Sequence, residues 1–194
     1  MGIGRFAEAA GSAGCAPMVL ASRSPQRKAL LEQLGVDFRV EPAAVEELRE
    51  GDPREVVVEN ALRKARAVDG ARVLGADTEV VLGCELLGKP RDEAEAESFL
   101  RRLAGRGHEV MSGLALRTAD GERSEVAVTQ VRFRGLTERE IAWYLASGEW
   151  RERAGGYAIQ GRGAALVESI EGDYWNVVGL PLPALLRLMP DLLG

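Results

Sequence analysis

The 194-residue chain is poor in the residues that build metal centres and disulfide frameworks. Its single histidine, His108, and its two cysteines, Cys15 and Cys84, are too few for the zinc sites of most zinc hydrolases or for a disulfide-stapled fold. Aromatic residues make up 5% of the chain and the formal net charge is −5, which argues against nucleic acid as a partner. No apolar run approaches the roughly 18 residues that a membrane-spanning helix needs, so we expect no membrane partner either.

The first residues also lack a targeting signal. Arg5 and Glu8 interrupt a segment rich in glycine and alanine, and no apolar core of a signal peptide follows. We expect residues 1–17 to be a flexible extension and residues 18–194 to form a single domain, because a domain typically has about 150 residues. The expected location is the cytoplasm.

Lysine is scarce as well. Lysine and arginine together number 25, yet the only lysines are Lys28, Lys64 and Lys89. Codon bias accounts for most of this imbalance. Because a compact ammonium group and a planar guanidinium differ as phosphate ligands, each lysine is nevertheless a candidate phosphate contact.

The apolar periodicity alternates between strand and helix and predicts an α/β domain with a mixed sheet. Strands are expected over 18–22, 36–40, 73–82 (one bent strand or a pair), 108–117 and 124–134, with two shorter strands flanking a turn at 171–173. Helices are expected over 25–34, 53–68, 92–103, 137–147 and 182–189. Trp143 and Tyr144 are assigned to the core, and His108 is assigned a structural role at the start of a strand.

The junction between the first strand and the first helix is one candidate site. Ser24 before Pro25 predicts a helix start, and a helix N-terminus attracts anions. Ser22, Ser24 and Arg27 add hydroxyl groups and a positive charge there. An ordinary capped helix with exposed arginines is the alternative interpretation.

A second candidate is Asp77, which ends an apolar run between small residues and precedes Thr78. A carboxylate held in such a place is suited to act as a general base or to hold a metal ion. Lys89, on the short Gly88-Lys89-Pro90 loop, would reach the same end of the sheet. The alternative is a turn aspartate and a solvated lysine.

The third candidate is the glycine-rich segment 154–163. Glycines let a backbone approach a ligand closely, and the planar amide of Gln160 offers both a donor and an acceptor to a base edge. Because histidine and cysteine clusters are absent, any metal is expected to be Mg²⁺ or Mn²⁺ on carboxylate oxygens. The chain has no G-x-x-x-x-G-K-[ST] loop and is therefore no P-loop enzyme.

Several ordered motifs resemble the Maf family of nucleoside triphosphate pyrophosphatases. They are Leu20-Ala-Ser-Arg-Ser-Pro-Gln-Arg27, Lys64-Ala65, Leu74-Gly-Ala-Asp-Thr78, Gly88-Lys-Pro90, Gly107-His-Glu-Val110, Ala154-Gly-Gly-Tyr-Ala-Ile-Gln-Gly161, Glu171-Gly-Asp-Tyr174 and Asn176-Val-Val-Gly-Leu-Pro181. The resemblance implies hydrolysis of a nucleoside triphosphate to the monophosphate and pyrophosphate. It also implies a two-lobed mixed α/β domain with a central cleft, similar to inosine triphosphatase, and a divalent cation.

The resemblance further implies roles for individual residues. Asp77 matches the family's proton acceptor, and Arg27, Thr78 and Gln160 match positions that set specificity. The remaining matches are three polar positions of the cleft, Glu47, Lys64 and Lys89. The two lysines would bind phosphates, and Glu47, together with Asp77, would hold the metal. A homodimer is expected by family analogy alone.

The Tyr157-Ala-Ile-Gln-Gly161 version of the loop resembles the subgroup that acts on dTTP and UTP rather than the subgroup that acts on 7-methyl-GTP. Three departures affect the expected substrate ranking. Gln26 stands where arginine is usual, Glu152-Arg153 replaces a common Asp-Lys pair, and Trp150 replaces a common proline. Two other functions stay open: a nucleotide-binding regulator of cell division without turnover, and a pyrophosphatase for modified or other non-standard nucleotides.

Overall fold

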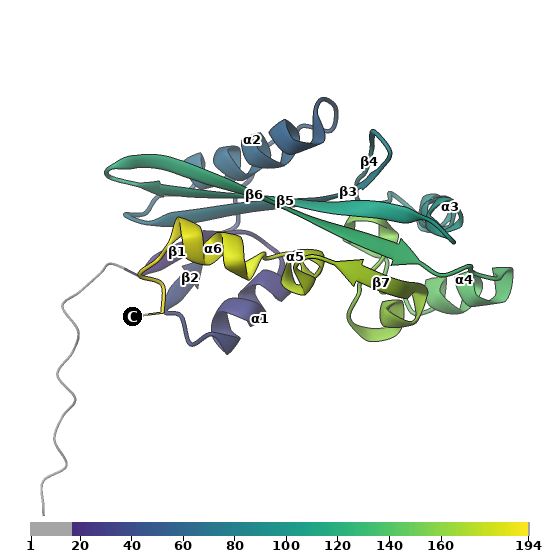
Figure 1. Ribbon diagram of the computed structural model, residues 1–194. Helices are drawn as coiled ribbons and strands as arrows, with labels where there is room; N and C mark the ends of the chain where they lie inside the picture. The colour runs from purple at the N-terminus through teal and green to yellow at the C-terminus, as the bar shows by residue number, and fades with distance from the viewer. Residues whose placement is uncertain (1–16, 194) are drawn as a thin grey trace, which may run out of the picture.

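The computed structural model describes residues 17–193, so the extension expected over residues 1–17 lies, except for Pro17, outside the described residues. A seven-stranded sheet in the order β2-β1-β3-β5-β6-β7, with β4 paired to β3, runs through the molecule (Figure 1). The strands are β1 (Met18–Ala21), β2 (Phe38–Val40), β3 (Val73–Leu82), β4 (Glu85–Leu87), β5 (Gly107–Thr118), β6 (Gly121–Phe133) and β7 (Val167–Glu171). The helices are α1 (Pro25–Gln33), α2 (Pro53–Arg66), α3 (Glu93–Leu103), α4 (Glu138–Leu145), α5 (Tyr174–Val178) and α6 (Leu182–Leu188), with 3-10 segments η1 (Ala154–Gly156) and η2 (Gly161–Leu166).

The sheet is mixed, as predicted. Strand β1 pairs in parallel with β2 and β3, whereas β3, β5, β6 and β7 pair antiparallel in succession. Residues 73–82 form one strand, which settles the choice between a bent strand and a pair. Strand β4, which turns back on β3 after Gly83, was not predicted, because three residues give too short a pattern to recognise.

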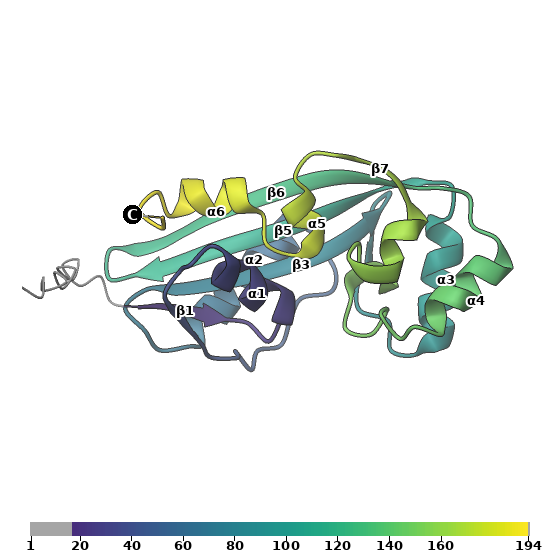
Figure 2. The ribbon, with the colours of Figure 1, turned by 90° about the horizontal axis from the view of Figure 1, so that it is seen from below.

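Two groups of helices lie at opposite ends of the long strands, which gives the predicted two-lobed shape (Figure 2). At one end, α1 and α6 enclose a cluster around Leu20, Leu31 and Leu114. At the other end, α3, α4 and the 3-10 segments enclose a second cluster around Leu100 and Phe133. Strands β3, β5 and β6 continue from one lobe into the other and join them.

Helix α2 lies directly on the sheet, on the face opposite α1, α5 and α6 (Figure 1). Two strand glycines make this approach possible. A Cβ atom at Gly75 would lie 2.0 Å from the Ala61 carbonyl oxygen, and one at Gly113 would lie 2.2 Å from the Val57 carbonyl oxygen. The helix backbone therefore occupies the space of two missing side chains, and this contact fixes which α2 residues reach the sheet.

Two predictions about local structure were wrong. The short strand expected after the turn at 171–173 is helix α5, whose N-cap Asp173 accepts a hydrogen bond from the Trp175 amide. The strand propensity of the aromatic and β-branched residues in this segment is overridden by capping and packing. Trp143 is 44% exposed rather than in the core, and its ring lies beneath the Arg162 guanidinium; Tyr144 is fully buried as expected. Among the described residues, no helix has the length and apolar character needed to cross a membrane.

His108 lies in the core of the second lobe. Its Nε2 atom is 2.8 Å from the Tyr157 hydroxyl, and its ring meets the Phe133 ring edge-on. Burial lowers the pKa of His108 from 6.5 to about 4. These contacts favour the structural role expected from the sequence.

The lowered pKa predicts how stability depends on pH. Above pH 6.5 the imidazole is neutral in both states; between pH 6.5 and about pH 4 the unfolded chain takes up a proton that the native state does not. The free energy of unfolding should therefore fall by up to about 3 kcal/mol across this window from this group alone. Urea unfolding of the wild type and of His108→Gln at pH 7 and pH 4.5 measures the difference. Parallel losses in the two proteins would contradict the assignment.

Candidate active site

Asp77 lies in the middle of β3, on the face covered by α2. It is 5% exposed, and both carboxylate oxygens are held by helix residues. The Asn60 amide donates to Oδ2 at 2.9 Å, and the Lys64 ammonium donates to Oδ1 at 2.6 Å. Because each carboxylate oxygen has two acceptor positions, Asp77 keeps acceptor capacity while its orientation is fixed.

Lys64 joins two of the predicted site residues. Its ammonium group also lies 2.6 Å from Glu47 Oε1, so one lysine, whose side chain is 11% exposed, bridges Asp77 and Glu47. Glu47 is on the segment before α2, which Asn60 holds by accepting from the Leu48 amide and donating to the Leu48 carbonyl. Asn60 was missed in the sequence, although a polar residue on the apolar face of a helix was the available signal.

Glu79 is a second residue that the sequence analysis missed. It follows Asp77 by two positions on one strand, and strand alternation places both side chains on the same face. Its Oε2 atom is buried without a hydrogen-bond partner. Burial, reinforced by the negative charges of Asp77 and Glu47 and opposed by Lys64 and Lys89, raises the pKa of Glu79 to about 8.

The α2 face of β3 therefore carries the oxygen ligands that a hard divalent cation prefers. Among residues 17–193, no group of three or more histidine, cysteine, aspartate or glutamate side chains is arranged as a metal site. The donor chemistry nevertheless fits Mg²⁺ or Mn²⁺, since Glu79 has an unpartnered buried oxygen beside Asp77 and Glu47. In this structure the Lys64 ammonium supplies the positive charge between Asp77 and Glu47.

Arg27 organises the opposite face of β3. It is 8% exposed and donates to the carbonyl oxygens of Gly179 and Ala76 and to the hydroxyls of Ser22 and Thr78, at 2.8 to 3.1 Å. Burial lowers the pKa of Arg27, and the nearby Asp77 and Glu47 charges oppose this shift. Four of the five N–H groups of a guanidinium are thus used inside the protein, so Arg27 connects α1, β3 and the end of α5.

Ser24 caps α1 as predicted. Its hydroxyl accepts from the Arg27 amide at 3.4 Å and donates to Gln26 Oε1 at 3.2 Å. Ser22 lies at the end of β1, and its hydroxyl accepts from the Ser24 amide. The structure therefore brings Ser22, Ser24, Arg27 and Thr78 together, on the face of β3 that is opposite to Lys64.

Lys89 approaches the site from the loop after β4. Its ammonium group is 3.4 Å from Glu152 Oε2, and both side chains are largely exposed. The two loops also meet through the backbone, where the Gly155 amide donates to the Gly88 carbonyl oxygen. Glu152 has a φ of +59°, a conformation that is uncommon for a residue other than glycine and that redirects the chain just before Arg153.

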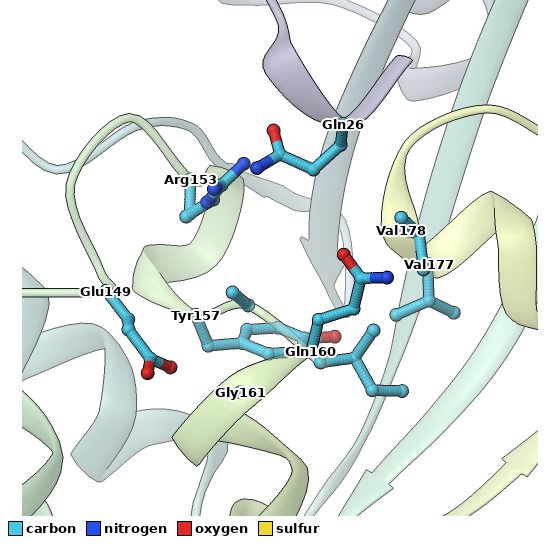
Figure 3. A pocket seen from close by; sticks show the side chains of 10 residues that line it. Gln26, Glu149, Arg153, Tyr157, Gln160, Gly161, Val177 and Val178 are labelled. Carbon is cyan, nitrogen blue, oxygen red and sulfur yellow. The ribbon is translucent and has the colours of Figure 1, made fainter. Parts of the chain in front are cut away.

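A pocket of about 230 Å³ lies between the two lobes. The residues that line it come from segment 149–161 in one lobe and from α1 and α5 in the other (Figure 3). Its walls include Tyr157, Val177 and Val178, and its polar side chains include Gln26, Arg153 and Gln160. The Gln160 side chain projects into the pocket between α5 and α1 (Figure 3).

Two of the residues that line the pocket are chain neighbours of the Arg27 contacts. Gln26 precedes Arg27, and Val178 precedes Gly179, whose carbonyl oxygen accepts from Arg27. Gln160 was expected near a ligand, and Gln26 and Arg153 were expected only to affect the substrate ranking; Val177 was not recognised as a lining residue. Their contribution depends on a contact between lobes that are distant in sequence, which no local pattern reveals.

The Maf-like protein family model matches residues 17–192. The chain is 50% identical over 178 residues to the dTTP/UTP pyrophosphatase of Symbiobacterium thermophilum, a match that covers 89% of this chain and 92% of that protein. It is also 50% identical over 179 residues to the dTTP/UTP pyrophosphatase of Thermus thermophilus, with 91% and 95% covered. The dTTP/UTP pyrophosphatase of Pyrococcus furiosus is 43% identical over 180 residues, with 89% and 93% covered.

Among solved structures, the Ham1 protein of Staphylococcus aureus has a TM-score of 0.46 and 14% sequence identity, with 61% of this chain and 72% of that chain covered.

Proposed function

The chain belongs to the Maf family, and we propose that it is a nucleoside triphosphate pyrophosphatase that converts dTTP and UTP to the monophosphate and pyrophosphate. The observation that carries this proposal is Asp77 itself. A buried carboxylate is fixed at both oxygens by α2, and α1 and α5, on the other face of the sheet, help to line a pocket between the lobes. Relatives at half identity over nine-tenths of the chain support the substrate class.

In this proposal Asp77 accepts a proton from the water that attacks the α-phosphate. Asn60 and Lys64 hold its carboxylate still, so the remaining acceptor positions point in a fixed direction. A positioned general base contributes typically 10²–10⁴-fold to such a reaction. Lys64 has a further role, because it neutralises Asp77 and Glu47 when the site is empty and can turn to a phosphate when substrate arrives.

Glu47 and Asp77, with Glu79 beside them, would hold the divalent cation. When bound, this ion supplies charge neutralisation for the phosphate oxygens and the leaving pyrophosphate. The protein's own positive groups act alongside it. Lys89, on its short loop, is close enough to Glu79 to lower the cost of placing negative charge there.

The expected specificity residues would link the centre that hydrolyses the phosphate to the pocket that binds the base. They are Thr78, Arg27 and Gln160. Arg27 donates to Thr78 and to Gly179, so it sets the position of α5, whose Val177 and Val178 form one wall of the pocket. The Gln160 amide meets the polar edge of the base from within that pocket. Apolar walls with a few polar groups are typical of sites that bind a flat ring.

Pyrophosphate release tests the proposal. The panel consists of dTTP, UTP, CTP, dGTP, 7-methyl-GTP and 5-methyl-UTP, each with Mg²⁺, with Mn²⁺ and with a chelator. We expect release to be led by dTTP and UTP and to disappear when the metal is removed. If folded protein released no pyrophosphate from any of these nucleotides, the proposed reaction would be contradicted. Release that persists with chelator would contradict its metal dependence.

A further inference from the structure

Arg153 is a charged side chain of the pocket that has no protein partner in the described part of the chain. Its guanidinium makes no hydrogen bond and no ion pair within 4.0 Å there, and its Nε atom is buried. The side chain lies in the pocket with its head turned towards Gln26 (Figure 3). A half-buried cation in a pocket is costly unless a ligand accepts its hydrogen bonds.

Glu149, the acidic side chain of the same pocket, binds backbone amides. Its carboxylate accepts from the amides of Arg162 and Gly163 at 2.9 to 3.3 Å, which fixes the start of η2. In Figure 3 it points towards Gly161 and away from the Arg153 head. The carboxylate of this pocket is therefore bound to backbone amides and makes no ion pair with Arg153 in the described part of the chain.

Gln26 adds a second donor next to Arg153. The Ser24 hydroxyl donates to Gln26 Oε1 at 3.2 Å, and in this orientation the amide nitrogen is the Gln26 atom without a hydrogen-bond partner in the described part of the chain. The nitrogen faces Arg153 across the pocket (Figure 3). Arg153 and Gln26 thus form a donor corner, by which we mean the part of the pocket where the N–H groups of these two side chains lie together. The guanidinium of Arg153 has no acceptor, whereas Gln26 Oε1 keeps one acceptor position.

Gln160 alone cannot tell uracil or thymine from cytosine. Its amide carries one donor group and one acceptor, and a half-turn about the last bond exchanges them. In one orientation it matches the N3–H and the 4-oxo group of uracil, and in the other it matches N3 and the 4-amino group of cytosine. Discrimination between these bases requires a group that is only a hydrogen-bond donor or only an acceptor. A guanidinium is such a group, because it has donors and no acceptor.

We propose that the donor corner of Arg153 and Gln26 binds the 4-oxo group of the base and thereby makes Arg153 the residue that favours uracil and thymine nucleotides over cytosine nucleotides. This inference rests on the proposed pyrophosphatase function and on a base bound in the pocket. A 4-amino group in the same place would direct its hydrogens at the N–H groups of Arg153 and Gln26. The apolar walls of Tyr157, Val177 and Val178 favour a base here rather than a phosphate chain.

The test compares kcat/KM for UTP and CTP in the wild type and in Arg153→Met. We expect the UTP to CTP ratio to fall by roughly ten- to a hundredfold in the variant, mostly through loss of UTP turnover, because a charged donor to the base is removed. Arg153→Lys should keep part of the ratio. Arg151→Met is the matched control: Arg151 is exposed and stacks on the Trp150 ring outside the pocket, so the ratio should not change.

Gln26→Glu provides a second, independent variant that keeps the size of the side chain. Its carboxylate would replace a donor by an acceptor and pair with Arg153, so the ratio should shift towards CTP. Equal losses for UTP and CTP in Arg153→Met would overturn the proposal, because they would place Arg153 on the phosphates or the ribose that both nucleotides share.

Binding of UMP and CMP, measured by calorimetry, separates this inference from the proposed reaction. If the wild type released no pyrophosphate from any nucleotide, the proposed function would fail, but the affinities of UMP and CMP would still report on the donor corner. A preference for UMP that Arg153→Met removes would support the inference. A wild type that binds UMP and CMP equally would overturn it.

Discussion

Replacement of Asp77 by asparagine is expected to lower kcat for dTTP and UTP by roughly 10²–10⁴-fold, the usual contribution of a general base. The change keeps the size of the side chain but removes the basic oxygen that would take a proton from water. It also places an amide against the Lys64 ammonium, which loses one of its two carboxylate partners and keeps Glu47. The effect should therefore fall on the chemical step.

The measurement compares single-turnover rates and the affinity for a non-hydrolysable dTTP analogue. We expect the rate to fall while the affinity changes by only a few-fold, because Arg27, Thr78 and the pocket residues stay in place. Asp120→Asn is the control, since Asp120 lies in the exposed turn between β5 and β6. Unchanged turnover in Asp77→Asn would remove Asp77 from the mechanism.

Local signals predicted much of the framework of this site. Ser24 and Pro25 start a helix in the sequence and in the structure, and Asp77 falls within the predicted strand. These features depend on residues that are adjacent in the chain, such as a capping hydroxyl or an apolar run. Asp77 and Thr78 are adjacent in this strand and face opposite sides of the sheet, which gives Asp77 its contact with α2 and Thr78 its contact with α1.

The contacts that determine the chemistry were less accessible from the sequence. Lys64 contacts Asp77 only because Gly75 and Gly113 let α2 pack close to the sheet where it crosses β3. Arg153 reaches the pocket only because segment 149–161 faces α1 and α5 across the gap between the lobes. Such positions depend on packing between segments that are far apart in the chain, which residue patterns within one segment do not encode.

Arg27 shows how a correct motif can still lead to an incomplete interpretation. Its place in the first turn of α1 indicated an anion ligand, yet its guanidinium donates to four protein oxygens. The hydrogen bonds to Gly179 and Thr78 make it a positioning residue for the pocket wall and for β3. Arg153, in a different segment of the chain, is a positive group that has no hydrogen bond or ion pair within the described residues.

The contact between α2 and the sheet leads to the second large expected effect. In Gly113→Ala, the new Cβ atom would lie 2.2 Å from the Val57 carbonyl oxygen and 2.7 Å from the Val58 nitrogen. These are backbone atoms, so only a movement of α2 or β5 can relieve the overlap. Overpacking of this kind typically costs about 1–3 kcal/mol, and more where the backbone cannot shift. That is a large part of the 5–15 kcal/mol by which domains are usually stable.

The same movement should also lower kcat under conditions in which the variant is still folded. Helix α2 carries Asn60 and Lys64, whose contacts with Asp77 are 2.9 and 2.6 Å long, and Asp77 pairs with Gly113 across the sheet. A misplacement of about 1 Å at a reacting group can cost roughly 10²-fold in rate. We therefore expect Gly113→Ala to lower both the urea midpoint and kcat measured well below the unfolding transition.

Gly107→Ala is the matched control, because Gly107 also lies in β5 but has no atom within 4 Å of its would-be Cβ. That variant should retain both stability and turnover. If Gly113→Ala were as stable and as active as Gly107→Ala, then α2 could move away from the sheet without disturbing Asp77. The geometry that fixes the carboxylate would then have to come from β3 and its strand neighbours instead of from the helix.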